Sequence, residues 1–312
     1  MRLKDALGSA RRNRALHRGV DQLLYDAADG RQPEPTTPRR VRPLRPARSV
    51  RSRAVRQPRA VSVVRPSPVF LGVLAIAALG AQMAWHADVS DTKTAAIGVF
   101  TFVVASWVIS LCLHEFAHAY VGYRAGDYGA ADAGYLTLNP LRYGHPVLTL
   151  LFPLLILLSG GIGLPGGAVL LHHHRFRSRG WASAVSAAGP AVNLLLAVTV
   201  TAFIRVADPV GHGAFWAGLA FAGYLQLSVG LINLLPIPGI DGWGIWEPWM
   251  PISWREAGAK VKPFGFFILF GLFAVGTAGA HWADFVSTLA TRAGLPPLMW
   301  MSGAWLFQFW KV

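Results

Sequence analysis

Residues 95–121 read AAIGVFTFVVASWVISLCLHEFAHAYV, an apolar run long enough to cross a bilayer as one helix. Near its end lies the pentapeptide His114-Glu115-Phe116-Ala117-His118. On a helix, residues four apart lie on one face a turn apart, so the two imidazoles can converge on one metal ion. Ionisable side chains are costly inside such a segment. Their presence therefore indicates a function in addition to packing.

The H-E-x-x-H pattern predicts a zinc site with His114 and His118 as two of its ligands. Glu115 would then lie beside the metal, where its carboxylate can take a proton from a zinc-bound water and return it to a leaving amine. That is the acid–base chemistry of a metalloprotease. The alternative is a set of polar residues at a helix end that only reach toward water.

The composition of the chain is that of a membrane protein. Of 312 residues, 53% are hydrophobic and only 14% charged, and the mean hydropathy is +0.40. We expect an all-α polytopic membrane protein with about six transmembrane helices. The apolar runs that suggest them are 66–87, 94–121, 180–204, 210–240, 263–283 and a less regular, Trp-rich run at 293–310.

A re-entrant or short β element is expected between the two halves of the metal site, within residues 146–171. Glycines and prolines interrupt residues 160–167, and residues 168–171 have a strand-like pattern. His172, His173 and His174 follow, but adjacent residues on a strand point to opposite faces. A second metal site there is the less favoured interpretation.

The N-terminal residues 1–65 differ from the rest of the chain. They carry a net charge of +12, against +2 for the other 247 residues, and from Arg31 onward they are rich in Arg, Pro, Ser and Thr. We expect a disordered, cytoplasmic basic tail, followed by a membrane domain over 66–312 with its core at 95–242. Anionic lipid is the expected partner of the tail, and nucleic acid is the less favoured alternative.

A catalytic zinc site with two histidines needs a third protein ligand, which is commonly a carboxylate. Residues 233–242 read NLLPIPGIDG, and their two prolines stop a regular helix. Irregular backbone at membrane depth is tolerated where protein or a water-filled cavity encloses it. Asp241 is therefore the candidate third ligand. The alternative is an Asp-Gly turn that only caps a helix end.

Four ordered elements of the chain resemble the site-2 proteases, a family of intramembrane zinc metalloproteases. They are His114 to His118, Leu138-Asn139-Pro140, the G-P-x-x-N segment from Gly189 to Asn193, and Asn233 to Gly242. The resemblance implies zinc ligation by His114, His118 and Asp241 with Glu115 as the catalytic base. It covers about residues 95–242, and one departure is His145-Pro146, where related sequences often have Asp-Pro.

We therefore expect a Zn²⁺-dependent endopeptidase in the cell membrane that acts on a transmembrane protein substrate embedded in the lipid bilayer. Asn193 and Asn233 are candidate donors to the developing oxyanion, because both are polar residues in apolar helices. Two rivals remain open. One is a zinc- or proton-coupled transporter that uses the same polar groups as an ion path, and the other is an inactive metal-binding scaffold.

Overall fold

The computed structural model describes residues 64–87, 91–143, 175–207, 209–274 and 277–312, which belong to one compact unit within residues 57–312. All regular structure in these ranges is helical. Several predictions fall outside the described residues. They are the basic tail, except for residues 64 and 65, the re-entrant element at 146–171 with its strand at 168–171, and His172 to His174.

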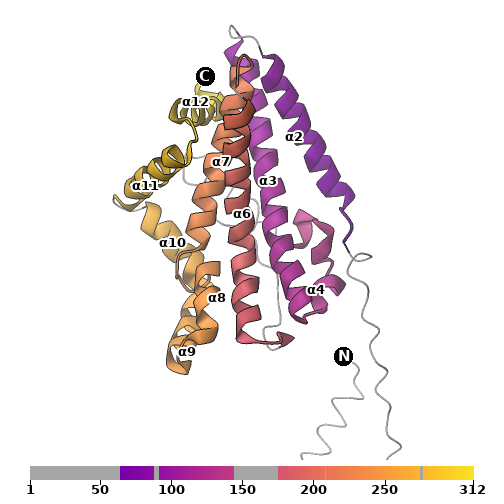
Figure 1. The fold of residues 1–312 in the computed structure, drawn as a ribbon, viewed down its shortest axis with the longest axis vertical. Coiled ribbons are helices and arrows are strands. Elements are labelled where there is room, and N and C mark those ends of the chain that lie inside the picture. Colours follow the sequence, from indigo (N-terminus) through magenta and orange to yellow (C-terminus); the bar gives the residue numbers. More distant parts are fainter. Residues whose placement is uncertain (1–63, 88–90, 144–174, 208, 275–276) are drawn as a thin grey trace, which may run out of the picture. The chain divides into compact units, whose positions relative to one another are not determined.

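Four long helices form the centre of this unit (Figure 1): α2 (Pro68–His86), α3 (Thr92–Ala125), α6 (Arg179–Ala207) and α7 (Gly213–Asn233). Short segments after α3 are α4 (Gly129–Asp132), η2 (Tyr135–Thr137) and η3 (Pro140–Arg142). The C-terminal part comprises α8 (Asp241–Trp246), η6 (Glu247–Trp249), α9 (Ile252–Val261), η7 (Lys262–Phe264), α10 (Gly265–Ala274), α11 (Ala278–Ala293), α12 (Pro297–Phe307) and η8 (Phe309–Lys311).

The ends of α2 and α3 follow directly from the sequence. The Ser67 hydroxyl accepts a hydrogen bond from the backbone N–H of Phe70, and Asp91 accepts one from that of Thr94, so each helix starts at a side-chain cap. Helix α3 ends at Gly126, whose φ of +122° suits a residue without a Cβ. The result is a single 34-residue helix that carries the His-Glu motif in its last third.

Helix α3 lies between its neighbours α2, α6 and α7 and contacts all three. It approaches α2 at two glycines: a Cβ on Gly80 would collide with the backbone N of Phe102, and one on Gly98 would lie 2.7 Å from the backbone N of Ala84. Small residues allow this close approach between apolar helices. The long helix that carries the candidate histidines is thereby fixed along its first half.

The described part of the chain holds four helices that are long and apolar enough to cross a membrane: α2, α3, α6 and α7. A fifth crossing results only if Ile252–Phe273 and α11, which meet at 85°, count as one broken span. The apolar run predicted at 263–283 is therefore divided between α10 and α11. The Trp-rich run at 293–310 contains α12, whose eleven residues rise about 16 Å, too little to cross a hydrocarbon core of about 30 Å alone.

Candidate metal centre

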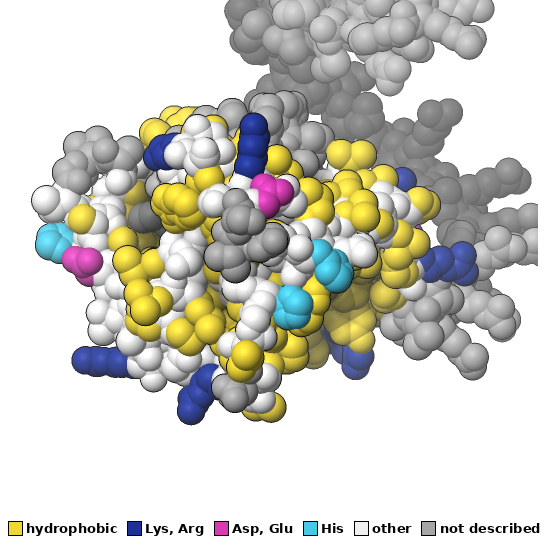
Figure 2. All heavy atoms as spheres, turned by 90° about the horizontal axis from the view of Figure 1, so that it is seen from above, with side chains coloured by type: hydrophobic (Ala, Val, Ile, Leu, Met, Phe, Trp, Pro, Cys, Tyr) yellow, Lys and Arg dark blue, Asp and Glu magenta, His cyan; other side chains and the backbone are white. Residues whose placement is uncertain are grey.

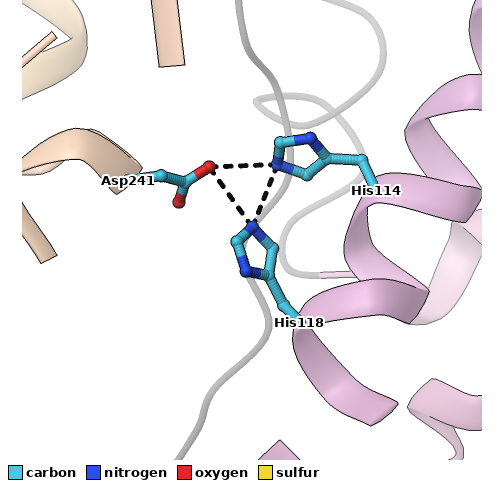
Figure 3. Close-up of side chains that lie close together, drawn as sticks. All are labelled: His114, His118 and Asp241. Carbon is cyan, nitrogen blue, oxygen red and sulfur yellow. Dashed lines mark hydrogen bonds and ion pairs between the residues drawn. The ribbon is translucent and has the colours of Figure 1, made fainter. Parts of the chain in front are cut away.

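The two histidines of the motif lie one turn apart on α3 and point at the same spot (Figure 3). Their Nε2 atoms are 3.0 Å apart, and both side chains are buried. Helical spacing alone produces this convergence, as the sequence predicted.

Asp241 reaches the same spot from the other half of the fold. Helix α7 ends at Asn233, the irregular segment contains Pro236 and Pro238, and Asp241 is the first residue of α8. One carboxylate oxygen, Oδ2, lies 3.1 Å from Nε2 of His114 and 3.2 Å from Nε2 of His118. Among the described residues these three form a group able to hold a metal ion.

Backbone contacts fix the segment that carries Asp241. A Cβ on Gly242 would collide with the carbonyl of Leu234, so the segment closes on the end of α7 only because residue 242 has no side chain. A Cβ on Gly265, the first residue of α10, would collide with the carbonyl of Pro238. The segment therefore packs between α7 and the start of α10.

The donor atoms fit a zinc ion. Bonds of 2.0–2.1 Å in a tetrahedron place ligand atoms about 3.3 Å apart, close to the 3.0–3.2 Å that separates the three atoms here. Gly189 on α6 faces the same spot, since a Cβ there would collide with Nε2 of His118 and lie 2.5 Å from Nε2 of His114. Two imidazoles and one carboxylate form the donor set of a catalytic zinc site, and the missing side chain of Gly189 leaves the space beside them open.

The second nitrogen of each ring has a fixed partner, which orients the first. Nδ1 of His118 lies 2.7 Å from the carbonyl oxygen of Val185, and Nδ1 of His114 lies 2.5 Å from Oδ1 of Asn193. Both acceptors require the proton on Nδ1 and leave Nε2 free as a ligand. Both partners are on α6, so α6 sets the tautomers of the histidines on α3.

A buried chain of hydrogen bonds continues from Asn193 across the bundle. Its Nδ2 donates to Oε1 of Gln226 on α7 at 2.7 Å, and Nε2 of Gln226 donates to the Ser110 hydroxyl on α3 at 2.8 Å. Ser110 in turn donates to the carbonyl of Trp107 at 2.8 Å. Oδ1 of Asn193 accepts from a ring N–H, so its amide group must point toward Gln226. A single assignment of donors and acceptors thus satisfies the side chains of His114, Asn193, Gln226 and Ser110.

The remaining predicted residues are buried but have no role that the geometry fixes. Glu115 follows His114 on α3 and is 2% exposed, and Asn233 ends α7 at 3% exposure. Their functions as base and oxyanion donor stay predictions. Asn193 was predicted as an alternative to Asn233 as the oxyanion donor; in the structure its side chain lies at Nδ1 of His114, between His114 and Gln226.

Sequence reasoning missed Gln226 and Ser110 as parts of the site. A signal for Gln226 was present, because it is the one side-chain amide between residues 213 and 232, a largely apolar stretch. Its partners could not be named, since they depend on how α3, α6 and α7 are rotated against one another.

Comparison with known proteins gives relatives over most of the chain. "Putative zinc metalloprotease Rip2" of Mycolicibacterium smegmatis is 44% identical over 248 residues, which are 80% of this chain and 95% of the relative. Its namesake in Mycobacterium tuberculosis (strain H37Rv) is 43% identical over 250 residues, 80% of this chain and 96% of the relative.

"Putative zinc metalloprotease YwhC" of Bacillus subtilis is 32% identical over 184 residues, 57% of this chain and 82% of the relative. No family model and no solved structure gives a significant match.

Proposed function

Because the chain belongs to the family of zinc metalloproteases that includes Rip2, we propose that it is an intramembrane endopeptidase of the site-2 protease type. It hydrolyses peptide bonds in or near the transmembrane helices of other membrane proteins. It does so as a multi-pass protein of the cell membrane with a cytoplasmic N-terminus.

The observation that carries this proposal is the position of the His114, His118 and Asp241 donors. The two histidines lie on α3, a helix apolar enough to span a membrane, and Asp241 follows α7, another such helix. A zinc protease whose ligands come from membrane-spanning helices has its site within reach of peptide bonds in the bilayer. That setting favours membrane-embedded substrates over soluble ones.

Each side chain then has a role in the hydrolysis. His114, His118 and Asp241 would hold zinc, which would polarise the scissile carbonyl and lower the pKa of a water molecule. Glu115 is the base that takes a proton from the attacking water and delivers it to the leaving amine. Asn233 donates a hydrogen bond to the developing oxyanion.

Asn193 has a different role in this proposal. Its oxygen accepts from His114 and its amide donates to Gln226. Asn193 and Gln226 are therefore positioning residues, which keep the Nε2 atom of His114 directed at the metal.

The test is Glu115→Gln, which keeps the size of the side chain and removes the base. The purified variant should retain zinc, while fragments of single-span proteins that accumulate in wild-type membranes should be absent from membranes that carry the variant. Quantitative membrane proteomics measures the fragments, and metal analysis measures zinc.

The control is His114→Ala, which should lose both zinc and cleavage because it removes a ligand. Unchanged fragment levels in Glu115→Gln would remove the proposed mechanism. Unchanged levels in both variants would show that the chain is not the protease that generates the fragments.

A further inference from the structure

A polar pocket of about 470 Å³ lies outside the zinc site, between the start of α6 and the segment that follows Asp241. Arg179 and Ala182 line it on the α6 side, and Glu247, Arg255 and Lys262 line it on the other. Helices α8 and α9 lie together at the end of the bundle where α6 begins (Figure 1). No role proposed above uses this pocket.

The charges in the pocket do not balance. Lys262 Nζ donates to both carboxylate oxygens of Glu247 at 2.7 Å, so this pair neutralises itself. Within the described part of the chain, the guanidinium groups of Arg179 and Arg255 make no hydrogen bond or ion pair, and both residues are exposed. Two unmatched guanidinium groups at one pocket attract an anion, and their planar N–H forks suit the oxygens of a phosphate.

The pocket is surrounded by side chains typical of the membrane–water interface. Trp246, Trp249 and Trp254 are 59%, 60% and 63% exposed; Trp249 and Trp254 belong to η6 and α9, which line the pocket, and Trp246 directly precedes Glu247 in its wall. Exposed tryptophans gather at the level of lipid headgroups. Arg179 is also the first residue of α6, a helix able to span the membrane. With α6 as a membrane span, the two guanidinium groups would be at the level of the phospholipid headgroups.

The opposite end of the molecule differs. Figure 2 views that end, and the Lys and Arg side chains in view are scattered singly among hydrophobic ones. Arg205, at the end of α6, and Arg292, at the end of α11, also lie away from the pocket. They offer a matched pair of cations for comparison.

We propose that this pocket binds the phosphate group of an anionic phospholipid, held by Arg179 and Arg255. Bound lipid joins the start of α6 to α9. The start of α6 is already linked to α8 and η6, the two elements before α9, by the Ser183 hydroxyl, which donates to the carbonyl of Ile245 at 2.7 Å and accepts from Nε1 of Trp249 at 2.9 Å. The lipid would reinforce a contact that lies next to the Asp241 segment.

The test measures lipid binding and needs no proteolytic activity. Full-length protein in neutral detergent is titrated with phosphatidylglycerol, and binding is followed by native mass spectrometry and by tryptophan fluorescence. The double variant Arg179→Gln/Arg255→Gln should bind about 30-fold more weakly, since each surface cation contributes about 1 kcal/mol. The control Arg205→Gln/Arg292→Gln, with the same charge change and the same basic tail, should bind like wild type.

Further arms identify the source of the anion. Phosphatidylcholine with the same acyl chains and inorganic phosphate should bind at least tenfold more weakly than phosphatidylglycerol. Equal binding of inorganic phosphate would overturn the lipid assignment in favour of a soluble phosphate site. Tighter binding of an acidic peptide would overturn it in favour of a substrate flank. Equal phosphatidylglycerol binding by both double variants would overturn the site itself.

Discussion

Helices α2 and α7 are both apolar enough to span a membrane, yet they occupy opposite environments. Protein buries 72% of the best apolar window of α7 and 22% of that of α2. Gln226, Ser228 and Asn233 are buried along α7, whereas α2 exposes Leu71 and Leu79. Polar side chains lie on the helix that protein encloses, where other side chains satisfy them, and the outer helix presents hydrocarbon to lipid. Apolar length alone does not distinguish the two.

The largest expected effect is at the centre of the enclosed region. Gly189→Ala places a Cβ against both histidine Nε2 atoms. Zinc content should fall to background and turnover by about 100-fold or more, since misplacement by about 1 Å is enough for such a loss. Metal analysis and a cleavage assay measure the two. Ala191→Ser, at an exposed position two residues later on α6, is the control and should match wild type.

A zinc-loaded, active Gly189→Ala protein would show that the metal lies on another side of the three donors. The enclosed space beside Gly189 would then not be the place where the metal binds, and the contrast between enclosed and lipid-facing helices would lose its main support.

A smaller effect is expected at Gln226 on α7, which is connected to His114 only through Asn193. Gln226→Leu removes the acceptor of Asn193 and the donor to Ser110. Zinc affinity should fall about 10-fold, the lower end of the usual loss when a partner that orients a metal ligand is removed, because Gln226 acts on His114 only through Asn193. A competition titration with a zinc chelator measures the affinity, and Gln226→Glu, which keeps the acceptor, should recover part of it.

The control for Gln226 lies on the same helix. Ser228 accepts a hydrogen bond from Nε1 of Trp282 at 3.1 Å, a pair not connected to His114. Ser228→Ala should lower stability by about 1 kcal/mol and leave zinc affinity unchanged. If both variants lost affinity equally, the chain through Asn193 would be a packing feature and not a positioning one.

The smallest effect concerns α2. Gly80→Leu should lower the melting temperature in detergent by several degrees, because overpacking costs about 1–3 kcal/mol and the new side chain meets the backbone of Phe102. Gly72→Leu makes the same substitution on the same helix where nothing lies within 4 Å, and it should be neutral. Equal melting temperatures would mean that α2 is not held at Gly80, and the difference between its two faces would disappear.

Local pattern was enough to predict the longest helix and the three residues, His114, His118 and Asp241, that come together as a group able to hold a metal ion. The spacing of His114 and His118 is a property of one helix, and Asp241 was identifiable because acids are rare near apolar runs that prolines interrupt. Because the chain belongs to a family of zinc metalloproteases, the transporter interpretation is no longer needed.

Features that depend on how helices meet were not predictable in the same way. Asn193 was singled out from its polarity, but its partners depend on the rotation of α6 against α3 and α7. The run at 263–283 looked continuous because hydropathy does not show where a helix bends. The structure divides the run between α10 and α11. The site was thus easier to predict from the sequence than the path of the chain after it.

The packing of Gly265 against the carbonyl of Pro238 gives the site a mechanical property. Two donors belong to one rigid helix, while the third belongs to a segment braced by α10, which begins more than twenty residues later in the chain. The distance from the Asp241 carboxylate to the two imidazoles therefore depends on the position of α10. If a neighbouring helix in the bilayer displaced α10, Asp241 would move and the two histidines would not, so that only the carboxylate would leave the metal site.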